Sequence, residues 1–173
     1  WFSPSELPRA VVVVPHGMNL NPQKMDELAQ VLAKSGFEVF RPAFYGHEGE
    51  NEKYLQVRAR DWEADARRIH GLASRRAKNL KKPLFLVAYS FSALIYQSLC
   101  HELSFDRKVF FAPALAPKFW YGALRLLPTA FPDFTYSSLN LPAYSANRRG
   151  SSRALLALDD FLQKWRKNGS TLD

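Results

Sequence analysis

Ser90 is the residue of this chain whose surroundings best suit covalent chemistry. It ends the apolar run Leu84-Phe85-Leu86-Val87-Ala88-Tyr89 and begins a helix-like pattern. A serine at a sharp turn between a buried strand and a helix is held in a strained conformation with its hydroxyl exposed, an arrangement called a nucleophile elbow. The turn needs small residues two positions away, and Ala88 and Ser92 supply them. Glycine, which tolerates positive φ best, stands at neither position, so the alternative is a strand-to-helix junction that carries a serine by chance.

The elements that must position Ser90 are predicted to alternate between strands and helices. Residues 10–14 contain four consecutive valines without polar alternation, which is typical of a strand buried on both faces of a parallel sheet. Asn21-Pro22 then begins a helix that Gly36 ends, and a second strand at 37–41 completes a βαβ unit. The later strands are expected at 83–88 and 109–112.

The other helices are predicted from apolar residues at helical spacing. A long segment from about residue 51 to 79 places its apolar residues on one stripe and its arginines mostly elsewhere, as on a solvated helix face. The stripe consists of Trp62, Ala66, Ile69 and Ala73. The helix after Ser90 continues to Leu103, which makes Cys100 a predicted core residue. Ser151 or Ser152 begins a last helix, and Asn168-Gly169 ends it.

A stretch rich in proline and bulky apolar residues, at about 113–142, interrupts this alternation. A long apolar insertion at the carboxyl edge of a parallel sheet is where substrate-covering elements occur, so we expect a short apolar cap. The alternative is that its aromatic residues only pack on the core. No linker or repeat divides the chain, so residues 1–173 are expected to form a single domain.

The composition argues against a nucleic-acid partner and against a membrane span. Lysine and arginine exceed the acidic residues by 24 to 16, a net charge of +8, but these charges spread over several helices without a nucleic-acid-binding motif, so we expect no nucleic-acid partner. No apolar stretch approaches the roughly 20 residues of a membrane span. The oligomeric state stays open.

The cysteine and histidines argue against other kinds of site. Cys100 is the only cysteine, which rules out an internal disulfide and leaves the compartment open, with a lean toward the cytoplasm. The four histidines show no ligand spacing and there is no glycine-rich phosphate loop, so neither a metal nor a cofactor is expected. Because the first residue is Trp1 rather than methionine, we expect that an upstream segment has been removed.

Three motifs in this order resemble the α/β-hydrolase fold family, in particular its carboxylesterase, monoacylglycerol-lipase and serine-aminopeptidase-like branch. Val11-Val12-Val13-Val14-Pro15-His16-Gly17-Met18 is similar to the family's first strand and oxyanion loop. Arg41-Pro42-Ala43-Phe44-Tyr45-Gly46-His47 is similar to its loop ending in Gly-His, and Ala88-Tyr89-Ser90-Phe91-Ser92 to its elbow. The resemblance spans nearly the whole chain and implies an α/β fold with a mostly parallel sheet flanked by helices.

The resemblance implies acyl transfer from a small-molecule substrate. Ser90 would attack a carbonyl carbon, and the backbone N–H groups of Met18 and Phe91 would hold the resulting oxyanion. Gly17 would let its loop turn close to the site. His16 would hold that loop by hydrogen bonding rather than act as the general base.

The family's catalytic acid and base have no counterpart here. Its triad runs in the order Ser, Asp or Glu, then His, but the last histidine, His101, lies about three helical turns beyond Ser90. Asp159 and Asp160 fall inside the predicted last helix. We therefore expect an incomplete α/β-hydrolase fold, truncated before two further strands that would carry the acid and the base.

Two functions of different kinds follow from this incomplete site. The first is a serine esterase or lipase-like hydrolase acting on a carboxylic ester or related acyl compound through a Ser90 acyl-enzyme, its base and acid lying beyond this chain. The alternative is a non-catalytic module that binds a hydrophobic ligand or a protein partner under the cap. A serine without an activating base is a weak nucleophile at neutral pH, so the chain alone should be nearly inactive.

Overall fold

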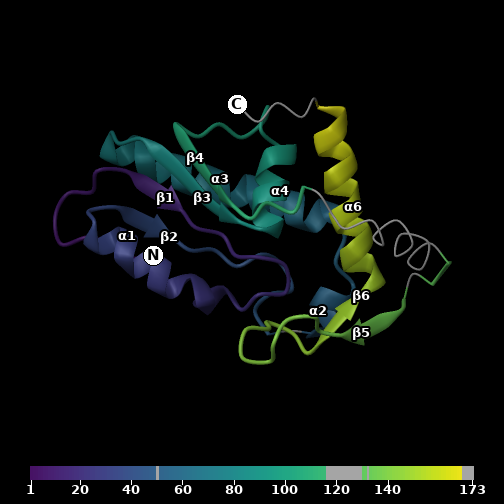
Figure 1. Cartoon of the computed structure of the whole chain (residues 1–173). Helices are drawn as coiled ribbons and strands as arrows, with labels where there is room; N and C mark the ends of the chain where they lie inside the picture. The colour runs from purple at the N-terminus through teal and green to yellow at the C-terminus, as the bar shows by residue number, and fades with distance from the viewer. Residues whose placement is uncertain (50, 116–129, 132, 169–173) are drawn as a thin grey trace.

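A four-stranded parallel sheet forms the centre of the computed structural model, which describes residues 1–49, 51–115, 130–131 and 133–168 (Figure 1). The strands are β1 (Val11–Val13), β2 (Glu38–Phe40), β3 (Leu84–Tyr89) and β4 (Arg107–Phe111), in the order β2-β1-β3-β4. All three neighbouring pairs are parallel. The loop after β1 and the turn after β3 therefore leave the same edge of the sheet side by side.

Helices cover both faces of this sheet, as the uninterrupted valines predicted. On one face, η1 (Pro22–Met25, a 3-10 helix) and α1 (Asp26–Lys34) pack on Val12 and Val14. On the other face, the core around Val11 and Val13 includes residues of α3 (Ala59–Leu80), α4 (Phe91–Ser98) and α6 (Ser152–Lys167). Successive side chains of β1 point to opposite faces, and both directions are buried here. The predicted α/β class is confirmed.

The expected long helix between residues 51 and 79 is instead two helices. α2 (Asn51–Leu55) ends before Val57, a fully buried residue, and α3 begins after Arg58, whose backbone is extended at φ −125° and ψ 159°. Asp61 accepts a hydrogen bond from the Arg58 N–H at 2.8 Å and so caps the new helix. The buried Val57 and the extended Arg58 therefore separate the two helices.

The helix after Ser90 is shorter than predicted. α4 ends at Ser98, and Cys100 lies half-buried in the following turn rather than in the core. The last helix begins where predicted: Ser151 is its N-cap and accepts a hydrogen bond from the Ala154 N–H at 3.2 Å.

A small antiparallel sheet of β5 (Thr135–Ser137) and β6 (Arg149–Ser151) lies beside α6 and was not predicted (Figure 1). β5 falls within the expected cap at 113–142, but most of that cap, residues 116–129 and 132, lies outside the described residues. The connection from β5 to β6 runs below the carboxyl edge of the main sheet and reaches the loop after β1.

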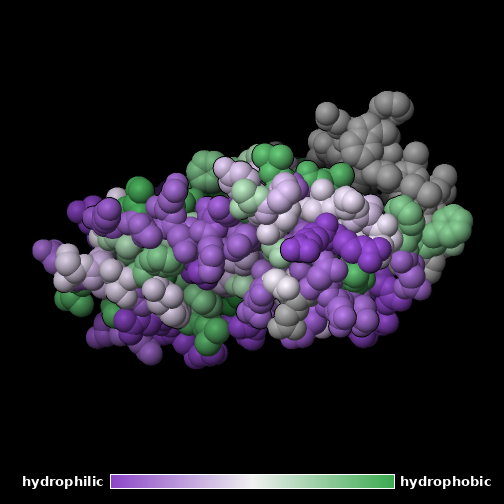
Figure 2. Space-filling view, turned by 90° about the horizontal axis from the view of Figure 1, so that it is seen from below, coloured by the Kyte–Doolittle hydropathy of each residue, from purple (hydrophilic) through white to green (hydrophobic). Residues whose placement is uncertain are grey.

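The face shown in Figure 2 is mostly hydrophilic, with apolar residues scattered over it. The arginines of α3 are exposed, as predicted for a solvated face, and several pair with nearby acids, among them Arg67 with Glu63 and Glu102. In the described part of the chain, no helix is long and apolar enough to cross a bilayer.

Candidate active site

Ser90 occupies the junction between β3 and α4 in a strained backbone conformation. Its φ is +53° and its ψ is −111°, a region that residues with a Cβ rarely adopt. The Ser90 N–H donates to the Phe111 carbonyl at 2.9 Å, so the end of β4 supports the turn. The side chain borders a pocket instead of entering the core. The predicted position of Ser90, in a tight turn at the carboxyl edge of the sheet, is confirmed.

Ser92 explains how this turn forms without its usual second glycine. The Ser92 side chain is fully buried, and its Oγ accepts a hydrogen bond from the Tyr89 N–H at 3.1 Å. Its own proton can go to the Tyr89 carbonyl at 2.9 Å or to the Pro15 carbonyl at 3.2 Å. The hydroxyl therefore bonds across the turn, to the peptide groups of Tyr89, and can also bond to Pro15 just after β1.

Gly17 brings the loop after β1 against the elbow. A Cβ at this position would lie 2.9 Å from two ring carbons of Tyr89 and 3.6 Å from the Cβ of Ser90. Only a residue without a side chain permits this approach without moving the Tyr89 ring. The structure thus brings the predicted oxyanion loop and the predicted nucleophile together.

His16 holds the Gly17-Met18 peptide in one orientation. The fully buried imidazole donates from Nδ1 to the Gly17 carbonyl at 2.8 Å and accepts at Nε2 from the Phe44 N–H at 3.1 Å. Because the carbonyl and N–H of a trans peptide point in opposite directions, the Met18 N–H points away from the His16 ring.

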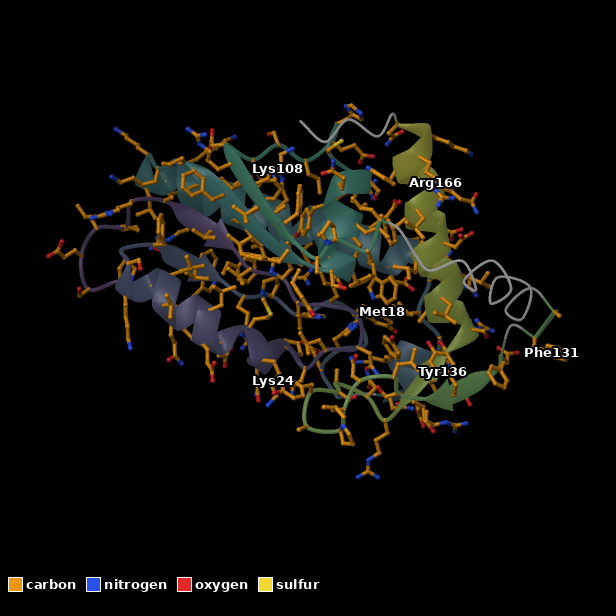
Figure 3. All side chains as sticks on the ribbon, in the orientation of Figure 1. Met18, Lys24, Lys108, Phe131, Tyr136 and Arg166 are labelled. Atoms are coloured by element: carbon orange, nitrogen blue, oxygen red, sulfur yellow. The ribbon has the colours of Figure 1, made fainter. Side chains whose placement is uncertain are left out.

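Met18 and Phe91 both have backbone N–H groups free to bind an anion. Neither N–H donates to any residue in the described ranges. Phe91 is the first residue of α4, where helical N–H groups lack partners and the helix dipole favours negative charge. Its side chain is buried against Trp62, with ring centroids 4.4 Å apart, which fixes the start of the helix. Figure 3 shows Met18 between the main sheet and the small sheet that carries Tyr136.

His47 is a second buried imidazole in the same loop system, and its role was missed in the sequence. Its Nε2 accepts from the Asn19 N–H at 2.9 Å, and its Nδ1 donates to the Tyr45 carbonyl at 3.2 Å. The rings of His16 and His47 lie 4.5 Å apart. The Gly46-His47 sequence was the available signal, but it did not reveal which backbone group the histidine holds.

Both imidazoles are neutral and already engaged at both nitrogens. Burial lowers the pKa of His16 to about 4 and holds the pKa of His47 well below its usual value. In each ring the Nε2 lone pair is taken by a backbone N–H. Neither is therefore available to accept a proton from Ser90.

The remaining described histidines and the predicted helical acids also lie away from this chemistry. His70 contacts the Ser104 carbonyl and His101 the Asn168 carbonyl. Asp159 and Asp160 lie within α6, as predicted, and Asp159 accepts from Gln163 Nε2 at 2.6 Å. Among the described residues, no group of three or more His, Cys, Asp or Glu side chains could hold a metal ion.

The pocket beside Ser90 has a volume of about 250 Å³ and a mixed lining. Apolar side chains from the loop after β1, the β5–β6 connection and α6 line part of it. Three tyrosines, three polar loop residues and two glycines line the rest beside Ser90. These residues are Met18, Leu20, Leu139, Leu155, Tyr54, Tyr89, Tyr136, Asn19, Ser138, Asn140, Gly17 and Gly150. Such a lining suits a small substrate with both apolar and hydrogen-bonding groups.

Comparison with known proteins agrees with this geometry. The model of the family described as Serine aminopeptidase, S33 matches residues 6–167. The structure is similar to one of the metagenome-derived lipolytic enzymes LipS and LipT, with a TM-score of 0.78 and 20% identity over 96% of this chain and 69% of that chain. It is also similar to a monoglyceride lipase from Saccharomyces cerevisiae, with a TM-score of 0.77 and 17% identity over 99% of this chain and 65% of that one.

A monoacylglycerol lipase from Paleococcus ferrophilus is a further neighbour, with a TM-score of 0.65, 18% identity and coverage of 95% of this chain and 69% of that chain. The chain thus spans about two thirds of the length of these structures. No curated protein sequence matches it significantly. These likenesses show the fold, and the family model, which matches most of the residues, shows the family. The chain belongs to the Serine aminopeptidase, S33 family of α/β-hydrolases.

Proposed function

We propose that Ser90 is the nucleophile of a serine hydrolase that acts on carboxylic esters or related acyl compounds. One observation carries the proposal: Ser90 has a strained backbone at φ +53° and borders a pocket. The neighbouring loop has its Gly17 carbonyl bound to the His16 ring, so this carbonyl does not occupy the site. Strain of this kind persists only where the surrounding structure enforces it, and here both Ser92 and Phe111 do so.

In this mechanism, the Ser90 Oγ attacks the carbonyl carbon of the bound ester. The carbonyl oxygen becomes an oxyanion, which accepts hydrogen bonds from the Met18 and Phe91 N–H groups. When the intermediate collapses, the ester bond breaks and the leaving oxygen takes up the proton that the base removed from Ser90, so that the alcohol departs and leaves an acyl-Ser90 that water hydrolyses. His16 and Gly17 support the loop, and no metal or cofactor takes part.

The proton of Ser90 must pass to a base outside the described residues. Every described histidine is either held at both nitrogens or distant from the elbow. A base positioned beside Ser90, oriented in turn by an acid, completes the site in the whole protein.

The substrate class rests on the pocket and on the relatives. The lining of the pocket offers apolar contacts for an acyl group and hydroxyl and amide groups for a polar alcohol portion. The neighbours named as lipolytic enzymes and monoglyceride lipases suggest the same class.

Covalent labelling tests the proposal in the protein as its gene encodes it. A fluorophosphonate probe should modify Ser90, read by peptide mass spectrometry, and Ser90→Ala should remove both the labelling and the hydrolysis of a short-chain p-nitrophenyl ester. Ser98→Ala is the matched control, because Ser98 is a buried α4 serine whose hydroxyl donates within its own helix, to the Ile95 carbonyl at 2.8 Å. If the whole protein does not label at Ser90, the proposal is wrong and a non-catalytic binding module remains.

A further inference from the structure

Asn140 joins the β5–β6 connection to the oxyanion loop. Its side-chain Nδ2 donates to the Met18 carbonyl at 3.1 Å and to the Asn19 carbonyl at 2.9 Å. One amide group thus holds two successive carbonyls of the loop, from a position more than 120 residues away in the chain. Asn140 also borders the pocket that Ser90 borders.

Asn19, in the oxyanion loop, also joins this loop to the β5–β6 connection. Its Nδ2 donates to Ser138 Oγ at 2.9 Å and to the Asn147 carbonyl at 3.0 Å, and its Oδ1 accepts from the Asn147 N–H at 2.9 Å. Its backbone has φ +49°, a left-handed conformation that asparagine adopts more readily than most residues. This arrangement makes Asn19 a fixed corner of the loop.

These bonds act on the peptide groups around Met18. His16 fixes the Gly17 carbonyl, which precedes the Met18 N–H, and Asn140 fixes the Met18 carbonyl, which follows it. With both flanking peptide planes held, the backbone dihedral angles of Met18 have little freedom left. His47 also holds the second plane, because its Nε2 accepts from the Asn19 N–H at 2.9 Å. Loss of the Asn140 bonds would leave this plane held on one side only, so that both peptide planes flanking Met18 could pivot and the Met18 N–H would lose its direction.

We propose that Asn140 is a positioning residue that aims the Met18 N–H at the oxyanion formed on Ser90. The inference rests on the proposed function, because it needs an oxyanion to stabilise. It makes the oxyanion hole depend on the β5–β6 connection, which begins within the expected cap at 113–142, so that movement of this connection changes the rate of the chemical step. Asn140 itself does not touch the reacting atoms.

The test compares three variants of the protein as its gene encodes it. Asn140→Ala removes both bonds, and Asn140→Asp keeps the shape but sets a carboxylate against two carbonyl oxygens. Asn168→Ala is the matched control, because Asn168 also donates its amide to one backbone carbonyl, that of Ser98, at 3.1 Å, away from the site. The measurements are kcat and KM for a p-nitrophenyl ester and the midpoint of urea unfolding.

We expect kcat to fall by about 10-fold to 100-fold in Asn140→Ala and further in Asn140→Asp, because a misplaced donor loses most of its effect on the transition state. KM should stay within about 2-fold, since the substrate carbonyl is bound weakly before charge develops. The unfolding midpoint of Asn140→Ala should match that of Asn168→Ala. A positioning role is supported if Asn140→Ala loses more kcat than Asn168→Ala while the two variants are equally stable.

Two results would overturn the inference. One is a kcat in both Asn140 variants equal to that of Asn168→Ala. The other is a rise in KM with no change in kcat, which would make Asn140 a substrate-binding residue. If Asn140→Ala does not fold, Asn140→Asp decides by the same criteria. Activity that survives Ser90→Ala refutes the proposed function instead, so the two failures are distinguishable.

Discussion

The two sides of Ser90 are built very differently. β3 lies between β1 and β4, so the turn at Ser90 has the oxyanion loop on one side and the end of β4 on the other. On the β1 side, polar side chains form hydrogen bonds with backbone groups of the loops around them. These side chains are His16, His47 and Asn19. On the β4 side, Val109 and Phe111 are 47% and 49% exposed, and no further described strand pairs with β4.

Under the proposed function, this difference would separate two tasks of a serine hydrolase. The fixed backbone groups of the β1 side would stabilise negative charge on the substrate. Proton transfer from Ser90 would instead depend on a group outside the described residues, because the two buried histidines of the β1 side already accept backbone N–H groups.

The largest effect should come from the proton acceptor that the proposed function places outside the described residues. We expect the chain 1–173 alone to react with a fluorophosphonate probe at least about 10³-fold more slowly than the protein as its gene encodes it, because loss of the base removes most of the activation of the serine. Peptide mass spectrometry at Ser90 measures both rates. Equal rates would mean that a described residue such as His47 acts as the base and that the two sides are not separate.

The buried histidines of the β1 side should show in the pH dependence of stability. The pKa of folded His16 is about 4, below its usual 6.5, so the unfolded chain binds protons more readily as the pH falls from about 6.5 to 4. Stability should therefore fall across this range by up to about 3 kcal/mol from His16 alone, and this contribution of His16 should level off below it. The free energy of unfolding in urea, measured at several pH values, checks this.

A variant isolates this contribution from that of other groups. His16→Gln should have a flatter pH profile than the original protein between pH 6.5 and 4. Parallel profiles for the two proteins would show that His16 is not held neutral in the fold.

The close approach of the oxyanion loop to the elbow should be sensitive to a single methyl group. In Gly17→Ala the new Cβ would lie 2.9 Å from the Tyr89 ring. Since Tyr89 is 39% exposed, its ring can move, and the cost should appear as a loop shifted from Ser90 rather than as unfolding. We expect kcat/KM for ester hydrolysis to fall by about 10-fold.

Gly71→Ala provides the control for this substitution. Gly71 lies within α3, and the nearest atom to its new Cβ would be Arg75 Nη1 at 3.6 Å. Alanine should stabilise the helix by about 0.5 to 1 kcal/mol and leave kcat/KM unchanged. An unchanged kcat/KM in Gly17→Ala as well would show that the loop does not need this approach.

The sheet and the elbow could be predicted because local sequence determines them. The valines of β1 and the apolar run of β3 have to be buried on both faces, and a serine at the end of such a run falls at the turn into α4. The last helix was predicted for the same reason, from a capping serine and an apolar stripe.

The polar network could not be predicted, because its members are loop residues far apart in the chain. Asn19, Asn140 and Asn147 share no periodicity, and the bonds between Asn19 and Asn147 span 128 positions. The three-residue strands β5 and β6 are too short to show alternation. Ser92 was taken only as a small residue, since its hydroxyl acts through the folded turn.

Ser92 joins the elbow to the end of β1, and its replacement should give the smallest effect. Ser92→Ala removes the acceptor for the Tyr89 N–H and the donor to the Tyr89 or Pro15 carbonyl. We expect a loss of about 1 to 2 kcal/mol in unfolding free energy, together with a several-fold slower labelling of Ser90, because the strained turn loses a support. Ser98→Ala, in the same helix, should lose a similar free energy without slowing the labelling, since its hydroxyl donates within the helix, to the Ile95 carbonyl. If both variants label at the original rate, β3 and β4 hold Ser90 without help from Ser92, and the hydroxyl serves stability alone.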